Sequence, residues 1–233
     1  MYRQTVFSLS IVGSILATGP AFAESPWYIG GSAGAYFRSD YSVAGTFHNG
    51  LGTTAPGTNT TTFSPGPIFN ASVGYKLAHG FRVEGEFGFT KYNIKSINPN
   101  TVDSADFPNL NGTKLSAPIG GDRERYIETV NLFYDLPFTG RFVPYIGAGF
   151  GAAEDRGSPA IFNEIGPVPG GTFRTSNAAT GVLPVALAEA GVTLKLADQW
   201  AVVPSYRFQY VFRSGNVAAE PANIVKIGLR RSF

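Results

Sequence analysis

The chain has 233 residues, a formal net charge of +2 and no cysteine. The missing cysteines exclude a disulfide framework, thiolate metal sites and a cysteine nucleophile, and a charge this close to balance gives little support to polyanion binding. Glycine (29 residues), proline (16), phenylalanine (19) and tyrosine (11) are abundant. Since these residues are poor or middling helix formers, the composition favours strands and turns.

Residues 1–23 differ from the rest of the chain. A basic Arg3 precedes an apolar run from Val6 to Ala17 and the tripeptide Ala21-Phe22-Ala23, which is the plan of a secretory signal peptide. The apolar run is too short to span a membrane, because a spanning helix needs about 20 apolar residues. We therefore expect export through the inner membrane, with a signal peptide over 1–23 and one domain over 24–233 (233 − 23 = 210 residues).

After residue 23, alternation of apolar and polar residues recurs in eight segments. The clearest is Trp200–Phe212, which is apolar at its even positions and mixed at its odd ones. A period of two is that of a strand with one apolar face. This segment is longer than a common strand of about 5–6 residues and long enough for a tilted membrane strand of about 9–11. The other segments, in chain order, are 27–37, 68–77, 81–92, 126–136, 142–153, 186–196 and 224–233.

The connections between these segments alternate in length. Short turns lie at 78–80, 138–141 and 197–199, and longer connections rich in Gly, Pro, Ser, Thr and Asn lie at 39–66, 93–121, 154–181 and 213–221. Tight turns at one end and long polar loops at the other are typical of an outer membrane barrel. A sheet in a bilayer can pair all its backbone groups only by closing on itself.

The sequence therefore predicts an all-β fold: an eight-stranded antiparallel transmembrane β-barrel with short periplasmic turns and long extracellular loops. Two alternatives stay open, a ten-stranded barrel in which part of a long loop adds a hairpin, and a soluble β-sandwich.

The last segment, 224–233, should close the barrel beside the first. Its alternation points four residues to lipid, Val225, Ile227, Leu229 and Phe233, and three residues inward, Lys226, Arg230 and Ser232. Arg231 breaks the alternation, and we expect its guanidinium to extend out of the hydrocarbon at the periplasmic edge.

Charged residues occupy many of the predicted inward positions. They are seven cations and four anions: Lys76, Arg82, Arg125, Lys195, Arg207, Lys226 and Arg230, with Glu84, Glu86, Asp135 and Glu189. Unpaired charges are too costly for a small lumen, so we expect a charge network. If the hairpin is symmetric about Asp198, Glu189 lies opposite Arg207 (198 − 9 and 198 + 9). We favour a lumen filled by this network, because small barrels are normally filled by their own side chains. The alternative is a gated, weakly anion-preferring pore.

Three glycines, Gly147, Gly149 and Gly151, alternate on one face of a predicted strand. They lack the Lys-Ser/Thr and the helix of a phosphate-binding loop. We expect their missing side chains to make room for Phe133 and Tyr145 inside the barrel.

Four stretches of the chain carry a resemblance to a known family. GFRVEGEFGFTKYNIKS (80–96), VNLFYDLP (130–137), VPYIGAGFG (143–151) and IVKIGLRRSF (224–233) resemble the opacity-type and major surface antigen family of bacterial outer membrane β-barrels and, more distantly, the OmpA transmembrane domain. The resemblance implies Gram-negative outer membrane placement, variable surface loops and, for some members, porin or adhesin roles. The terminal apolar residues Val225, Ile227, Leu229 and Phe233 are similar to the signal read by the barrel-assembly machinery, from which Arg231 departs.

We expect a surface protein of the cell outer membrane, antigen-like or adhesin-like, with a plugged lumen. A small porin is the alternative, and a lipid-modifying barrel enzyme is a remote one. Such an enzyme would use His48 with Asp103 and Ser104, but nothing in the sequence fixes their separation, and we expect no catalysis and no cofactor. His79 lies in a predicted turn without a carboxylate cluster near it in sequence, so we expect no metal site.

The expected partners are outer membrane lipid and lipopolysaccharide, the barrel-assembly machinery, and a host or surface ligand at the loops. The loops expose aromatic residues that would touch such a ligand or pack onto the barrel rim: Tyr41, Phe47, Phe63, Phe107, Phe162 and Phe173. No basic and aromatic patch indicates nucleic acid.

Overall fold

The computed structural model describes residues 25–48, 54–102, 115–116, 119–138, 140–158, 160–163, 172–174, 181–196, 199–212 and 219–233. The predicted signal peptide over 1–23 lies outside these ranges. The elements in them are strands and one 3-10 turn, η1 (Ala78–Gly80). The helical content of the described residues therefore includes nothing long and apolar enough to cross a membrane.

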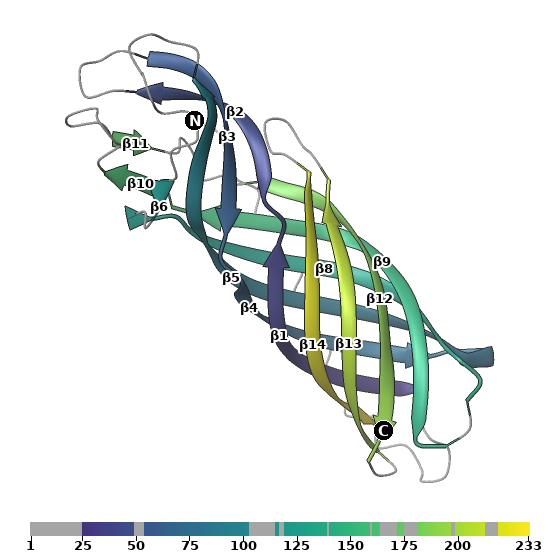
Figure 1. Ribbon diagram of the computed structural model, residues 1–233. Coiled ribbons are helices and arrows are strands. Elements are labelled where there is room, and N and C mark those ends of the chain that lie inside the picture. The colour runs from purple at the N-terminus through teal and green to yellow at the C-terminus, as the bar shows by residue number, and fades with distance from the viewer. Residues whose placement is uncertain are drawn as a thin grey trace, which may run out of the picture.

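Eight long strands form a closed wall. They are β1 (Trp27–Arg38), β4 (Gly66–Lys76), β5 (Phe81–Val102), β8 (Asp122–Asp135), β9 (Phe142–Gly157), β12 (Gly181–Lys195), β13 (Trp200–Val211) and β14 (Glu220–Ser232). They pair antiparallel in the order β5-β4-β1-β14-β13-β12-β9-β8, and β8 pairs with β5 to complete the ring (Figure 1). The predicted eight-stranded antiparallel barrel is confirmed.

The first and last strands lie side by side, as predicted. Ala35 of β1 is opposite Val225 of β14, and the pairing runs from Tyr28 to Arg38. The alternation of β14 also has the predicted sense. The four outward residues Val225, Ile227, Leu229 and Phe233 are 47–60% exposed, whereas Lys226 is 8% exposed.

One predicted loop is wrong over most of its length. Within 39–66, β2 (Tyr41–His48) and β3 (Thr54–Phe63) form a hairpin, and β3 pairs with the part of β5 beyond Asn93 that was also assigned to a loop. Burial alternates along β3 although most of its residues are polar: Asn59, Thr61 and Phe63, at every second position, are buried. Threonine is β-branched and fits a pleated sheet well. A threonine-rich segment therefore has the polar composition of a loop but can form a strand.

The hairpin does not enter the wall, so the barrel keeps eight strands rather than ten. Short strands add to the same end: β6 (Leu115–Ser116) pairs with β5, and β7 (Ile119–Gly120), β10 (Ala160–Asn163) and β11 (Thr172–Arg174) form a separate small sheet. The predicted loop boundaries shift accordingly.

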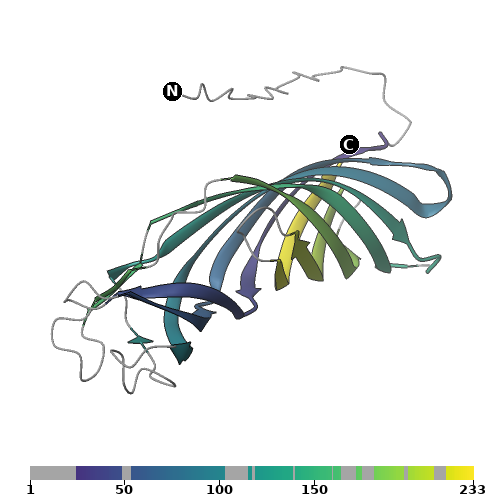
Figure 2. The ribbon, with the colours of Figure 1, turned by 90° about the horizontal axis from the view of Figure 1, so that it is seen from above.

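The barrel has two distinct ends. The loop end carries β2, β3, β6, β10 and β11, and the C-terminus lies at the opposite, turn end (Figure 1). Seen from above, β2 and β3 project beyond the barrel at one end (Figure 2). The 22 residues of β5 correspond to about 73 Å of strand at about 3.3 Å per residue. Because a tilted strand crosses a membrane in about 9–11 residues, roughly half of β5 stands outside the membrane.

Two apolar clusters fill parts of the interior. The larger one lies toward the loop end and includes Ile68, Tyr92, Ile127, Val185, Val211 and Ile224. The smaller one is formed by Phe133, Tyr145 and Val203.

The predicted role of the glycines is correct for one of the two aromatic rings. A Cβ on Gly147 would lie 2.2 Å from Cδ1 of Phe133, so this glycine makes room for that ring. Space for Tyr145 comes instead from Gly191, whose Cβ would lie 2.7 Å from the tyrosine hydroxyl. Gly149 accommodates the side chain of Asn131. The register between neighbouring strands decides which side chain lies over each glycine.

Candidate functional site

Among the described residues, twelve charged side chains gather inside the lumen in three groups of four, and each group has two cations and two anions. The loop-end cluster is Arg38, Arg125, Asp155 and Glu220. The middle cluster is Arg207, Lys226, Glu86 and Glu189. The turn-end cluster is Arg82, Arg230, Glu84 and Asp135.

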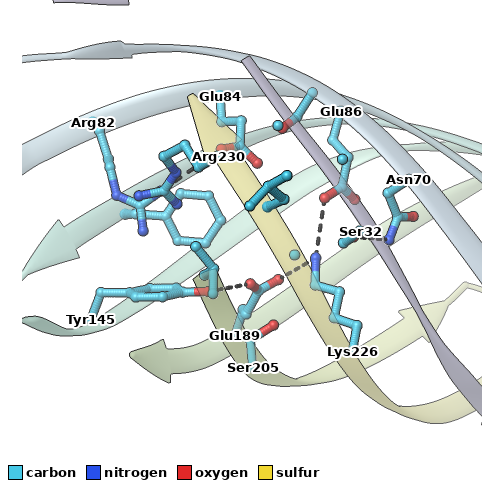
Figure 3. Close-up of a pocket in the computed structure, with 17 residues that line it drawn as sticks. Ser32, Asn70, Arg82, Glu84, Glu86, Tyr145, Glu189, Ser205, Lys226 and Arg230 are labelled. Carbon is cyan, nitrogen blue, oxygen red and sulfur yellow. Dashed lines mark hydrogen bonds and ion pairs between the residues drawn. The ribbon is translucent and has the colours of Figure 1, made fainter. Parts of the chain in front are cut away.

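The middle cluster contains the pair predicted from hairpin symmetry. Glu189 of β12 is opposite Arg207 of β13, and Nη2 of Arg207 lies 2.6 Å from Oε2 of Glu189. The same guanidinium reaches across the barrel and donates from both terminal nitrogens to Glu86 of β5. Lys226 bridges the two carboxylates at 3.2 and 3.1 Å, and the Tyr145 hydroxyl donates to Glu189 at 2.8 Å (Figure 3). Each charge in this cluster therefore has at least two partners of opposite charge.

The turn-end cluster is built around Arg82. Its Nε donates to Asp135 at 3.0 Å, its Nη1 donates to the Tyr28 hydroxyl at 3.2 Å, and Glu84 lies 3.8 Å away. Its guanidinium also lies over the rings of Phe133 and Tyr145, at 4.3 and 4.5 Å from their centroids. Such a stacked and paired guanidinium is held in one orientation.

Arg230 completes the turn-end cluster without a direct ion pair to a described carboxylate. It lies 4.7 Å from the centroid of Tyr28 and donates a long hydrogen bond of 3.4 Å to Thr193. In Figure 3 it points toward Arg82 and Glu84.

Only one residue of the loop-end cluster, Arg125, was predicted. It forms ion pairs with Asp155 and Glu220 and donates to the Tyr36 hydroxyl at 2.9 Å. Arg38 pairs with the same Glu220 from the other side. The sequence interpretation missed Arg38 and Asp155 because the predicted strands ended before them, and it missed Glu220 because the predicted last strand began after it.

Two predicted members do not join the network. Lys76 and Lys195 occupy inward positions at the last residues of β4 and β12, and both are exposed at the turn end. The predicted excess of seven cations over four anions is therefore wrong. Among the described residues the network holds six of each sign, since it loses these two lysines and gains Arg38, Asp155 and Glu220.

An apolar layer separates the loop-end and middle clusters. Along β14 the inward residues between Glu220 and Lys226 are Ala222 and Ile224, and along β8 Ile127 follows Arg125. Ile127 and Ile224 are at most 2% exposed. An ion crossing this layer would lose its hydration without gaining a partner, which is strongly unfavourable.

The described lumen contains one small cavity between two of the charge clusters. A cavity of about 40 Å³ lies between the middle and turn-end clusters, lined by Ser32, Asn70, Glu86, Glu189, Lys226 and Arg230 among others (Figure 3). At 10–15 Å³ or more for each water, this volume holds roughly three waters. This pocket lies within the charge network.

Several other predicted residues fall outside this site. Asp103, Ser104 and Phe107 lie outside the described residues, and so do the side chains of Phe47, His48, Phe162 and Phe173. His79 is exposed in η1. Within the described part of the chain, no group of three or more His, Cys, Asp or Glu could hold a metal ion.

Two of the predicted loop aromatics pack onto the barrel rim. Phe63 is 8% exposed and belongs to the larger apolar cluster, against which Tyr41 also packs. Their rings stack at 5.6 Å, and the Arg38 guanidinium lies 3.9 Å from the centroid of Phe63. The expectation that Phe63 is exposed is wrong.

The outer face of the wall has the opposite character. Phe69, Phe87, Val130, Phe150 and Ile227 are each about half exposed or more, so a band of apolar side chains faces outward while charged and polar side chains face inward. A closed sheet with this arrangement is an integral membrane β-barrel.

Comparison with known proteins agrees with this class. A family model described as an outer membrane protein beta-barrel domain matches residues 9–233, and the chain belongs to that family. It is therefore a protein of the bacterial outer membrane, in which the turn end faces the periplasm and the loop end faces the outside. No curated protein sequence matches the chain.

Two solved structures illustrate the shared fold. The crystal structure of Neisserial surface protein A has 16% sequence identity and a TM-score of 0.51, and the match covers 91% of this chain and all (100%) of that one. The outer membrane protein OprG from Pseudomonas aeruginosa has 12% identity and a TM-score of 0.53, with coverage of 90% and 97%. At these identities the likeness concerns the fold alone.

Proposed function

We propose that this protein is a non-conducting surface protein, antigen-like or adhesin-like, in which the barrel is an anchor and the extracellular strands carry the activity. The observation that supports this proposal most directly is the balanced charge of the lumen. Three charge clusters, each of net charge zero, fill the interior, and an apolar layer lies between two of them. An anion-preferring pore would need a cation excess along the lumen, and the described residues have none.

The extracellular extension supports a role outside the cell. The hairpin β2–β3 and the outer part of β5 form a continuous sheet beyond the wall, and β3 pairs with β5 from Phe63 to Gly57. Phe63 and Tyr41 anchor the base of this sheet to the barrel core. A sheet held in this way has a defined orientation, and a defined orientation lowers the entropic cost of binding a partner.

Single-channel recording on the full chain in planar bilayers tests the closed lumen. We expect a folded, heat-modifiable protein that gives no discrete current steps. Reproducible steps that vanish or change selectivity in Arg207→Ala would instead identify a small porin, with the middle cluster as its gate.

Surface labelling tests the second half of the proposal. An epitope inserted between His48 and Thr54, at the tip of the β2–β3 hairpin, should be reached by antibody on intact cells. The same epitope in the short periplasmic turn at Gly140 should be reached only after the outer membrane is permeabilised. Labelling of the two insertions under the same conditions would contradict the proposal.

The other expected partners concern assembly. We propose that the alternating residues Val225, Ile227, Leu229 and Phe233 are read by the barrel-assembly machinery before β14 pairs with β1. The outward position of all four side chains supports this proposal. The assembly machinery would bind them on the unpaired edge of β14, before the barrel closes and lipid covers them.

A further inference from the structure

The periplasmic end carries exposed cations without anionic partners. Lys76, Arg141, Lys195 and Arg231 are all exposed there. None of the four forms an ion pair with a described carboxylate, and the carboxylate of Asp135 at this end is bound to Arg82. Glu24 and Asp198 lie outside the described residues; if both faced this end, and with the α-carboxylate of Phe233 also counted, the charge of these groups would still be +1 (4 − 3).

The extracellular rim differs from the periplasmic end in its charge balance. Two of its described cations form ion pairs: Lys91 lies 3.7 Å from Glu124, and Arg156 lies 3.0 Å from Glu154. The other two, Lys95 and Arg123, are offset in charge by Asp40 and Asp122. The surplus is therefore specific to the periplasmic side and does not follow from the composition of the wall in general.

Arg231 has the most unusual position of the four cations. It faces outward from β14, in register with Ile29 on one side and Trp200 on the other. Its guanidinium lies 5.6 Å from the centroid of Trp200 and 5.4 Å from that of Phe233. Both rings are more than 40% exposed, as expected for aromatic residues at the membrane interface.

We propose that this end of the barrel binds the phosphate groups of anionic phospholipids in the inner leaflet, and that Arg231 with Trp200 and Phe233 forms the main headgroup site. The acyl chain would lie along Ile29 and Leu229, which are outward and 48% exposed each. A guanidinium at the interface is a good phosphate ligand because it donates two parallel hydrogen bonds.

The other cations extend the site around the rim. The backbone N–H of Lys195 donates to the carbonyl of Arg141 at 2.9 Å, so these two residues are neighbours. Lys195 pairs with Ala201, which pairs with Arg230 beside Arg231. Two strand spacings of about 4.8 Å therefore place Lys195 and Arg231 about 10 Å apart at the backbone. Anionic headgroups would be favoured along this whole arc, and each cation near the surface adds attraction.

The chain contains its own reporter for this site. Its two tryptophans are Trp27 and Trp200, and a Trp27→Phe background leaves Trp200, beside Arg231, as the single tryptophan, which can be excited selectively over the tyrosines. We would reconstitute the full chain in phosphatidylcholine vesicles that contain an equal share of either brominated phosphatidylglycerol or brominated phosphatidylcholine, and measure quenching. We expect brominated phosphatidylglycerol to occupy the site next to Trp200 with roughly five-fold preference, which is the effect of about one cation–lipid contact.

Two variants make the result specific. Arg231→Gln should bring the preference close to one, whereas Arg156→Gln should leave it unchanged, because Arg156 is an outward arginine on an aromatic ring at the other rim. Equal quenching by the two lipids in the unaltered site would overturn the proposal, and so would a preference that survives Arg231→Gln. Loss of the preference on adding inorganic phosphate would show a site for free phosphate rather than for a lipid headgroup.

Discussion

Removal of the Arg207 guanidinium tests the charge network most directly. In Arg207→Met the side chain keeps most of its length but loses every donor. Glu86 and Glu189 would then share a single cation, Lys226, which lies 3.2 and 3.1 Å from them. The middle cluster would change from two cations and two anions to one cation and two anions, in a site where Arg207 is 1% exposed.

The size of the effect follows from the uncompensated carboxylate. Removing one partner of a buried ion pair typically costs 3–5 kcal/mol, mainly because the other charge is left buried. We expect Arg207→Met to lower the free energy of unfolding by about 4 kcal/mol. Adding Glu189→Gln restores one cation to one anion, so the double variant should be more stable than Arg207→Met alone by about 2 kcal/mol.

Urea unfolding in lipid vesicles, followed by the loss of heat-modifiable migration, measures both quantities. Arg156→Met is the matched control: this guanidinium pairs with Glu154 at 3.0 Å but is 57% exposed, and an exposed pair contributes at most about 1 kcal/mol. If the Glu189→Gln and Arg207→Met effects simply add, charge balance is not what stabilises the lumen and the reasoning is refuted.

Two further substitutions test packing. Gly147→Ala should lower the free energy of unfolding by about 1–3 kcal/mol, because its Cβ would lie 2.2 Å from Cδ1 of Phe133. Gly85→Ala is the control: its Cβ meets nothing within 4 Å, so the urea midpoint should not change. Equal midpoints for the two variants would contradict this account. Phe63→Ala removes a ring that packs edge-on against Tyr92 at 5.9 Å, and a loss of about 3 kcal/mol should appear as faster proteolysis of the β2–β3 hairpin while the wall stays resistant. Unchanged cleavage would mean that the extension is not anchored through this ring.

The wall could be predicted from the sequence because a membrane imposes a strict rule on it. Lipid on one side and a small polar lumen on the other force a period of two, and Trp200–Phe212 displays it without exception at the positions that matter. The extracellular strands lie outside the lipid, so no such rule applies to their outer face. Because of its polar composition, β3 was predicted to be a loop, although its alternate residues Asn59, Thr61 and Phe63 are buried.

The contacts in the lumen divide into predictable and unpredictable ones. Partners across one hairpin are equidistant from its turn, which is why Glu189 could be placed opposite Arg207. The same rule applied to the β8–β9 hairpin would have placed Asp155 opposite Arg125 (125 + 155 = 280 = 135 + 145). The bond from Arg207 to Glu86 spans 121 residues. It depends on the diameter and stagger of the closed barrel, which no local pattern encodes.

Small errors at strand ends change the functional interpretation. The inward count from sequence was seven cations and four anions, an excess that suits an anion pore. Moving Lys76 and Lys195 out to the rim and extending the strands to include Arg38, Asp155 and Glu220 gives 7 − 2 + 1 = 6 cations and 4 + 2 = 6 anions. The lumen becomes neutral, and the displaced lysines join Arg141 and Arg231 on the periplasmic surface. The unpaired cations among the described wall residues therefore gather at the periplasmic end, where we propose contact with the inner leaflet.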